Sequence, residues 1–146
     1  MNEEKNVLII EKIYHAFARG ELETILGLLS DDVDWFVPGP EDIPYSGRYP
    51  NKEKVKWFFQ ILIQTTTVEQ FEAKEFFARG ERIVVLGYER IRVNATGRAF
   101  ENDWVHIWTL KDGKVIQFRE ALDTATMVQA FRNDSPRRIV LNKKRI

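Results

Sequence analysis

The sequence predicts an α+β domain, in which helices pack on one face of an antiparallel sheet. Apolar residues recur at helical spacing through residues 3–19, 21–29 and 52–64. From residue 65 onward the pattern changes to the two-residue alternation and β-branched composition of strands. Each helix must bury its apolar stripe, and a following antiparallel sheet supplies the surface. We therefore expect the order helix, helix, strand, helix, four antiparallel strands and a last helix.

The first half of the chain contains the helices that should cover the sheet. Gly20 can end the helix over residues 3–19. A short strand is expected over residues 33–37, and Asn51 can cap the helix over 52–64. Four of the five prolines fall in the intervening segment, which predicts a loop of fixed shape rather than a linker.

The second half of the chain reads as two hairpins and a final helix. Strands are expected over residues 67–77 and 82–93, and two more flank a turn that contains Asp112 and Gly113. An Asp-Gly pair between alternating apolar runs is a strong hairpin signal. Asp123 can cap a last helix over residues 124–131.

The hairpin that contains this turn is the stretch around which the candidate site is organised. In its first strand, one face carries Asn102, Trp104, His106 and Trp108. In its second strand, the alternation places Phe118, Glu120 and Leu122 with Ile116 on one side. The opposite side should carry Val115, Gln117, Arg119 and Ala121. A histidine and a carboxylate among apolar neighbours either find partners or do chemistry.

Composition is that of a soluble globular protein with one core. The chain has 146 residues, 44% hydrophobic and 30% charged, without cysteine. Disulfides, thiolate catalysis and zinc–cysteine sites are therefore excluded. No apolar run approaches the roughly 20 residues that span a bilayer, and the N-terminus does not read as a signal peptide. We expect a cytoplasmic protein that does not enter membranes.

Charge is balanced overall but unevenly placed. Six of the 22 Lys and Arg residues lie at or after Arg132, against one of the 22 acids. The sequence thus divides into a domain over residues 1–132 and a basic tail over 133–146. The tail could touch nucleic acid or an acidic partner, but a solvated extension is the favoured interpretation and nucleic-acid binding is not expected.

Three segments carry a family resemblance: YHAFARGE from Tyr14, LSDDVDW from Leu29, and DGKV followed by FREALDTA between Asp112 and Ala125. Together they resemble the nuclear-transport-factor-2-like superfamily, in its SnoaL-like and ketosteroid-isomerase-like branch. The resemblance covers about residues 1–132. It implies a cone-shaped curved sheet wrapped around the N-terminal helices, with an apolar pocket inside. It also implies a homodimer through the outer sheet face, here including Val105, Ile107 and Thr109.

The resemblance also implies roles for individual residues. Glu120 matches the aspartate on the last strand that acts as acid or base in SnoaL-like cyclases and in enzymes like limonene epoxide hydrolase. Tyr14 matches the first-helix tyrosine of ketosteroid isomerases, and His106 falls near their acidic oxyanion donor. The position of their catalytic base is occupied by Val37, which cannot accept a proton, so that mechanism does not carry over.

The epoxide hydrolases also hold their water with an Arg-x-Asp pair on the preceding strand. Only Arg98 and Asp103 lie near that position, and their spacing is wrong. The sequence therefore argues against epoxide hydrolysis.

Each candidate has a structural alternative. Glu120 is either an acid–base catalyst or a buried carboxylate neutralised by one of three arginines: Arg48, Arg90 or Arg92. His106 either donates a proton to the substrate or is a core histidine bonded to backbone or to Glu120. Tyr14 either stabilises charge on a substrate oxygen or packs in the core with a tethered hydroxyl, which we favour.

Other residues are expected to shape the pocket. The predicted substrate-binding residues are aromatic or polar: Trp35, Phe58, Tyr88, Asn102, Trp104, Trp108 and Phe118. The second histidine, His15, should face solvent, and two histidines without clustered carboxylates do not indicate a metal site. Neither a metal nor an organic cofactor is expected.

These features predict an isomerase or polyketide-cyclase-like enzyme that acts on a small hydrophobic carbonyl compound by acid–base chemistry. The first alternative is a non-catalytic domain that binds small ligands in the same pocket. The second is an interaction module that works through the sheet face or the basic tail.

Overall fold

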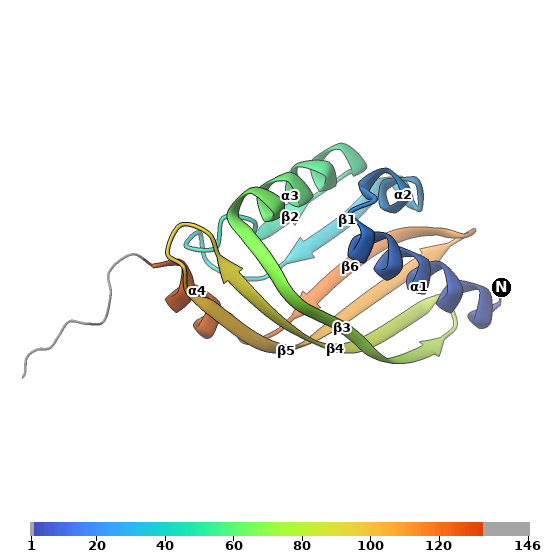
Figure 1. Ribbon diagram of the computed structural model, residues 1–146. Coiled ribbons are helices and arrows are strands. Elements are labelled where there is room, and N and C mark those ends of the chain that lie inside the picture. Colours follow the sequence, from blue (N-terminus) through green and yellow to red (C-terminus); the bar gives the residue numbers. More distant parts are fainter. Residues whose placement is uncertain (1, 133–146) are drawn as a thin grey trace, which may run out of the picture.

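The computed structural model describes residues 2–132 as a curved, six-stranded sheet with helices over its concave face (Figure 1). The α+β class is therefore confirmed. The basic tail at 133–146 lies outside the described residues. The elements are α1 (Glu3–Arg19), α2 (Leu22–Gly27), β1 (Leu29–Val37), β2 (Gly47–Tyr49), α3 (Lys52–Thr65), β3 (Thr66–Arg79), β4 (Arg82–Val93), β5 (Ala99–Lys111), β6 (Lys114–Ala121) and α4 (Thr124–Phe131).

The strands are ordered β2-β1-β6-β5-β4-β3. All neighbours pair antiparallel except β1 and β6, which run parallel. This parallel pair brings the first strand of the chain against the last one. The sequence did not predict it, because the two strands are separated by most of the domain.

Local signals correctly placed the end of α1 and the starts of α3 and α4. Gly20 closes α1 in a left-handed conformation, the Asn51 side chain accepts from the backbone of Lys54 at the start of α3, and Asp123 caps α4. Asp112 and Gly113 both have positive φ, at 51° and 79°, as the expected tight hairpin turn requires.

Two boundaries in the first half differ from the prediction. The second helix ends at Gly27, and β1 begins at Leu29 rather than at residue 33, because Leu29 pairs with Val115 and is fully buried. Strand β2 was not predicted at all. It spans only three residues within the proline-rich segment and gains its hydrogen bonds from β1.

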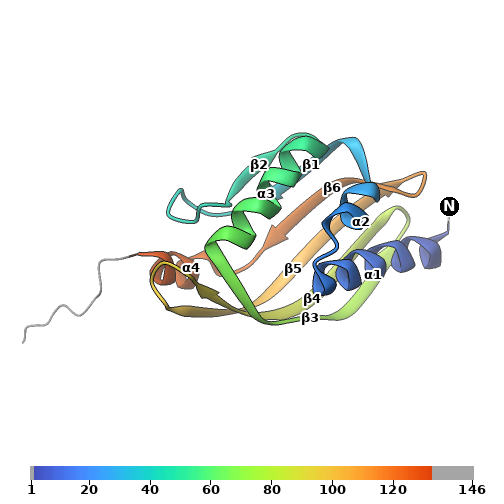
Figure 2. The ribbon, with the colours of Figure 1, turned by 45° about the horizontal axis from the view of Figure 1, so that its top comes forward.

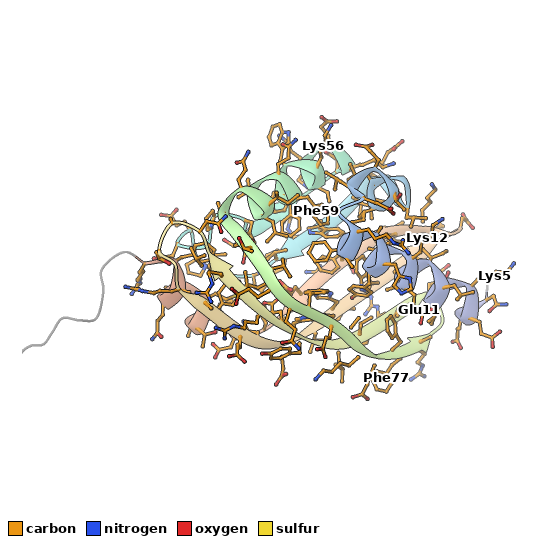
Figure 3. The ribbon with its side chains drawn as sticks, viewed as in Figure 1. Lys5, Glu11, Lys12, Lys56, Phe59 and Phe77 are labelled. Carbon is orange, nitrogen blue, oxygen red and sulfur yellow. The ribbon has the colours of Figure 1, made fainter. Side chains whose placement is uncertain are left out.

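A layer of side chains fills the space between the helices and the sheet. In Figures 1 and 2, α1, α2 and α3 lie over the concave face, while α4 lies at one end against β4 and β5. Figure 3 shows Phe59 of α3 directed into this layer and Lys12 and Lys56 directed outward. Within residues 2–132, none of the helices is long and apolar enough to cross a membrane.

Strand β6 contains an irregularity that changes which residues face inward. Gln117 pairs with Thr109, but the next pair along β5 is Leu110 with Val115, so Ile116 is an extra residue in the ladder. The sequence analysis predicted that Val115 and Glu120 lie on opposite faces of the sheet, and this prediction is wrong. The bulge turns Val115 inward, where it is fully buried on the same side as Phe118 and Glu120.

Candidate functional site

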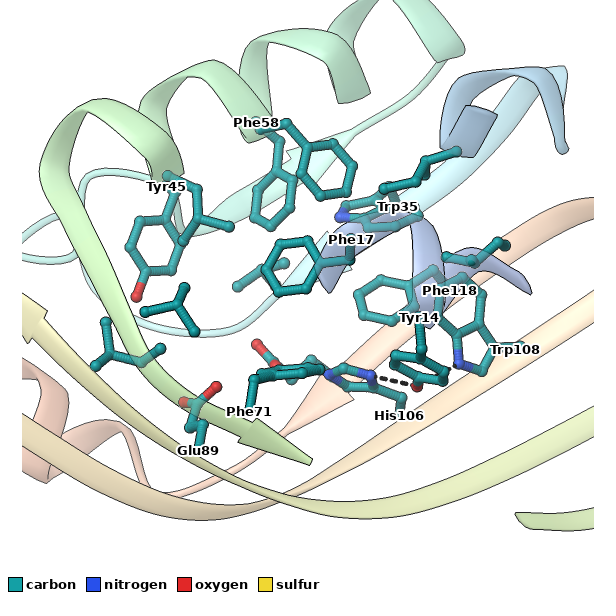
Figure 4. Close-up of a pocket in the computed structure, with 18 of the residues that line it drawn as sticks. Tyr14, Phe17, Trp35, Tyr45, Phe58, Phe71, Glu89, His106, Trp108 and Phe118 are labelled. Atoms are coloured by element: carbon teal, nitrogen blue, oxygen red, sulfur yellow. Dashed lines mark hydrogen bonds and ion pairs between the residues drawn. The ribbon is translucent and has the colours of Figure 1, made fainter. Parts of the chain in front are cut away.

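A cavity of about 80 Å³ lies between the helices and the concave face of the sheet (Figure 4). That is several times the roughly 10–15 Å³ that one water molecule needs. Most of its wall is aromatic or aliphatic. Five lining residues carry titratable groups, namely Tyr14, Tyr45, Glu89, His106 and Glu120. Neither lysine nor arginine lines it.

Three of these groups form a hydrogen-bonded chain with Trp108. The Trp108 indole Nε1 donates to the Tyr14 hydroxyl at 3.0 Å, and that hydroxyl lies 2.7 Å from His106 Nδ1. On the other side of the ring, His106 Nε2 lies 2.8 Å from Glu120 Oε2. His106 and Glu120 are direct cross-strand partners in the β5–β6 pair, whereas Tyr14 reaches them from α1.

The imidazole of His106 is held in place by aromatic rings. It stacks on Trp104 with 3.9 Å between ring centroids, and Trp104 in turn stacks on Phe71 at 4.9 Å. Phe118 contacts the imidazole edge at 4.8 Å. With both nitrogens bonded, one face stacked on Trp104 and Phe118 packed against it, the ring has one orientation.

Gly87 makes this stack possible. It lies on β4 opposite Trp104, and a Cβ there would fall 2.1 Å from the Trp104 ring and 2.3 Å from the carbonyl oxygen of Glu72. Only glycine fits at this position. Sequence reasoning overlooked it, although an isolated glycine inside a strand often marks such a close approach.

Burial determines the charges of the central pair. Removal from water raises the pKa of Glu120 to about 7 and lowers the pKa of His106 to about 3. His106 is therefore neutral near pH 7, and Glu120 is divided between acid and carboxylate. Burial also raises the pKa of Tyr14 well above 10, so its hydroxyl keeps its proton.

Proton positions follow when Glu120 is ionised. The carboxylate can only accept, so His106 carries its proton on Nε2 and donates it to Glu120. His106 Nδ1 then accepts from the Tyr14 hydroxyl, whose oxygen accepts from Trp108. Every group in this chain has a partner, which favours the carboxylate form in an otherwise apolar wall.

The arginine alternative for Glu120 is wrong. The three arginines pair with other acids: Arg48 with Asp34, Arg90 with Glu69 and Glu101, and Arg92 with Glu69. The partner of Glu120 is His106. For His106, the structure shows the hydrogen bond to Glu120 that the structural alternative predicted, and it also places the imidazole in the cavity wall.

The other predicted site residues divide into two groups. Trp35, Phe58, Trp108 and Phe118 line the cavity, as does Val37. Trp104 and Asn102 do not line it. They are buried, Trp104 beneath His106 and Asn102 with its Nδ2 donating to the carbonyl oxygen of Asp123 at 3.2 Å.

Tyr88 was assigned to the wrong face. The inward residues of β4 are the odd-numbered ones from Ile83 to Val93, so Tyr88 points outward and its hydroxyl bonds to Glu101. The same parity directs Glu89 into the cavity, where only 6% of it is exposed. Sequence reasoning missed Glu89, although an acid on the buried face of an alternating strand was a readable signal. Tyr45, in the proline-rich loop, was missed as well.

His15 is exposed, as predicted. Among residues 2–132, no three His, Asp or Glu side chains cluster closely enough to hold a metal ion.

The curved sheet, the helices over its concave face and the lined cavity define an NTF2-like protein. Residues 10–118 match the model of the SnoaL-like domain family, and the chain belongs to that family. A comparison with curated protein sequences found no significant match.

Solved structures agree with this assignment. An NTF2-like protein from Burkholderia xenovorans LB400 is 31% identical, with a TM-score of 0.83, over 90% of this chain and 99% of that one. TerC, co-crystallised with polyporic acid, is 25% identical, with a TM-score of 0.76, over 87% of this chain and 98% of that one. A structure from Mesorhizobium loti that bears the name of a SnoaL-like polyketide cyclase is 18% identical, with a TM-score of 0.65, over 79% of this chain and 97% of that one. This last likeness supports the fold alone.

Proposed function

We propose that this protein is an enzyme that moves a proton on a small apolar carbonyl compound, as an isomerase or a polyketide-cyclase-like enzyme does. The observation that carries the proposal is the contact of Glu120 with neutral His106 at the wall of an apolar cavity. A general base works best when its pKa lies near the working pH, and burial raises the pKa of Glu120 to about 7.

In this scheme Glu120 is the catalytic residue. Its Oε2 is held by His106, which leaves Oε1 to take a proton from the carbon beside the substrate carbonyl. The carbon–hydrogen electron pair moves into a carbon–carbon double bond, and the carbonyl oxygen becomes an enolate. Return of the proton to another carbon completes an isomerisation. Alternatively, the enolate carbon attacks a second carbonyl, and Glu120 gives its proton to the new alkoxide.

His106 and Tyr14 act as positioning residues in this scheme. Both nitrogens of His106 and the hydroxyl of Tyr14 are already engaged in the hydrogen-bonded chain. Their contribution is to fix the direction of the Glu120 carboxyl and to stabilise its ionised form.

The cavity limits the size of the substrate. As it stands, it admits a guest of a few heavy atoms. A groove of about 600 Å³ between α1, α2 and β3 lies against the same wall, and the rings of Phe17 and Phe71 border both spaces at 5.1 Å between centroids. A larger substrate, including one with a single benzene ring, requires these two rings to separate.

Deuterium exchange into the methyl group of acetophenone, followed by NMR, tests the proposal. We expect the wild-type protein to accelerate exchange and Glu120→Gln to abolish most of the acceleration. Glu75→Gln, an exposed glutamate on β3, is the matched control and should behave as wild type. Equal exchange by wild type and Glu120→Gln would remove Glu120 from the mechanism.

A second candidate is a non-catalytic domain that binds small ligands in the same cavity. The presence of valine at the position of the isomerase base favours it, because Val37 lines the cavity but cannot take a proton. Saturable binding of acetophenone without exchange at any pH would support this alternative.

We also propose that the outer sheet face forms a homodimer. Val84, Leu86, Val105 and Ile107 give this face apolar surface that is only partly covered. Sedimentation of the wild type and of Ile107→Lys would test this. A wild-type monomer at micromolar concentration would refute it.

A further inference from the structure

The cavity has a second polar end that the proton-transfer scheme does not use. Glu89 of β4 and Tyr45 of the loop between β1 and β2 lie at one end in Figure 4, while Tyr14 and Trp108 lie at the other. His106 and Glu120 are the other titratable residues of the lining, and the rest of the wall is aromatic or aliphatic.

Both groups are buried without a polar partner. Glu89 is 6% exposed and Tyr45 is 4% exposed. Among the residues that the structure describes, neither the Glu89 carboxyl nor the Tyr45 hydroxyl forms a hydrogen bond. Tyr45 is bonded through its backbone carbonyl instead, which accepts from the Tyr49 hydroxyl. A fully buried polar group without a partner costs about 1–3 kcal/mol, and both groups border the cavity, where a ligand atom can pair with them.

Burial, with nearby negative charge second, decides the protonation of this end. Burial, and then the nearby carboxylate of Glu120, raise the pKa of Glu89 well above its ordinary value. Burial, and then the charges of Glu89 and Glu120, raise the pKa of Tyr45 well above 10. Since no lysine or arginine lines the cavity, nothing there compensates a second negative charge. Both shifts favour the protonated form, in which each group is an O–H donor.

We propose that Glu89 and Tyr45 form a subsite that binds an oxygen atom of the ligand, a carbonyl or hydroxyl, through two O–H donors. This inference rests on the proposed function and adds the hydrogen-bond donors to the substrate oxygen that the proton-transfer scheme lacks. Because Tyr14 and His106 are committed to Glu120, the substrate carbonyl needs other donors. Donors already aimed at the oxygen on which charge develops stabilise an enolate without reorganisation.

An ammonium group is the competing ligand for this end, because carboxyls and aromatic rings also bind cations. It would require Glu89 to be ionised in the complex. The apolar wall and the charge of Glu120 oppose that ionisation in the free protein. The two chemistries differ in how they depend on the Glu89 proton, and one set of probes separates them.

Ligand-observed NMR on the full chain, with benzaldehyde, toluene and benzylamine as probes, tests the subsite. We expect wild type to bind benzaldehyde about 5–10-fold more tightly than toluene, the effect of one or two net hydrogen bonds. Glu89→Gln keeps a donor and should preserve this preference. Glu89→Leu should remove most of it, and Tyr45→Phe should reduce it, while toluene still binds. Retained toluene binding shows that these variants fold.

Three outcomes would overturn the subsite. The first is a benzaldehyde preference that survives in both Glu89→Leu and Tyr45→Phe. The second is tight benzylamine binding that Glu89→Gln abolishes. The third is no benzaldehyde binding to wild type at millimolar concentration. Benzaldehyde has no enolisable hydrogen, so its binding to wild type reports the subsite without the proton transfer. Failure of acetophenone exchange with an intact benzaldehyde preference would therefore refute the catalysis and not the subsite.

Discussion

His106 Nε2 lies 2.8 Å from Glu120 Oε2, and the pair belongs to neighbouring strands that face each other in register. A solvent-exposed pair of this kind would form imidazolium and carboxylate. Here burial holds the imidazole neutral and leaves the carboxyl close to half-ionised at pH 7. The contact therefore provides a base rather than a permanent ion pair.

The pH dependence of exchange should report Glu120. Because only the carboxylate accepts a proton, the acetophenone exchange rate of wild type should rise from pH 5 to pH 8, with a midpoint near the Glu120 pKa of about 7. Glu120→Gln should lower the rate at pH 8 by about 100-fold or more and lose the midpoint. NMR rates at several pH values measure both effects. A wild-type profile without a midpoint between pH 6 and 8 would contradict this assignment.

Tyr14→Phe should weaken the base through His106. The change removes the hydroxyl that bonds to His106 Nδ1 and to Trp108 Nε1. Without that support the ionised form of Glu120 is less stable, so the exchange midpoint should move to higher pH and the rate at pH 7 should fall about tenfold. We expect about 1–3 kcal/mol of lost stability from the two unpaired nitrogens.

The matched control for this change is Tyr88→Phe, which removes a tyrosine hydroxyl on the outer face of the sheet. It should leave the midpoint unchanged. If Tyr14→Phe destabilises the protein but its midpoint stays at the wild-type value, Tyr14 has only a packing role.

Gly87→Ala should displace Trp104, the ring on which His106 stacks. The added methyl group would overlap the Trp104 ring and the Glu72 carbonyl, and the backbone atom cannot move away without breaking the β3–β4 pairing. We expect about 1–3 kcal/mol or more of destabilisation in urea unfolding, together with reduced exchange as His106 loses its stacking partner. Gly27→Ala is the control, since nothing lies within 4 Å of its added Cβ. Wild-type stability of Gly87→Ala would show that the stack is loosely packed.

Glu89 should make folding stability depend on pH. Its pKa is raised in the folded state, so the folded protein keeps a proton that the unfolded chain releases. Its contribution to stability is complete below the ordinary value of 4.5 and is lost as the pH rises toward the folded value. Glu120, facing the same space, adds a change of the same sign up to about pH 7. His106 acts in the opposite sense below its ordinary pKa of 6.5, because the unfolded chain binds a proton there that the folded protein excludes. The melting temperature of wild type should therefore fall between pH 6.5 and pH 9.

Glu89→Gln cannot ionise, so its melting temperature should fall less over the same range. Calorimetry of the two proteins at matched pH values measures the difference. Parallel curves for wild type and Glu89→Gln would mean that Glu89 is as acidic in the folded protein as in the unfolded chain.

Much of the fold could be predicted because its signals are local. The ends of α1 and α4, the tight turn at Asp112 and the bounds of β4 follow from residues within a few positions of each other. Strand parity correctly directed His106 and Glu120 to one face. The same parity also predicts that Tyr88 points outward and Glu89 inward. The sequence analysis nevertheless assigned Tyr88 to the pocket and did not consider Glu89.

By itself, the sequence determined which segments are helices and strands, and that a histidine and a glutamate face one side of a hairpin, because backbone periodicity and turn chemistry act over short range. Only the tertiary structure decided that Tyr14 bonds to His106 across 92 positions, that β1 pairs with β6, and that a bulge turns Val115 inward. It also decided the charge of Glu120 and Glu89, because desolvation depends on every element that closes around a group. Periodicity along one strand contains none of that information.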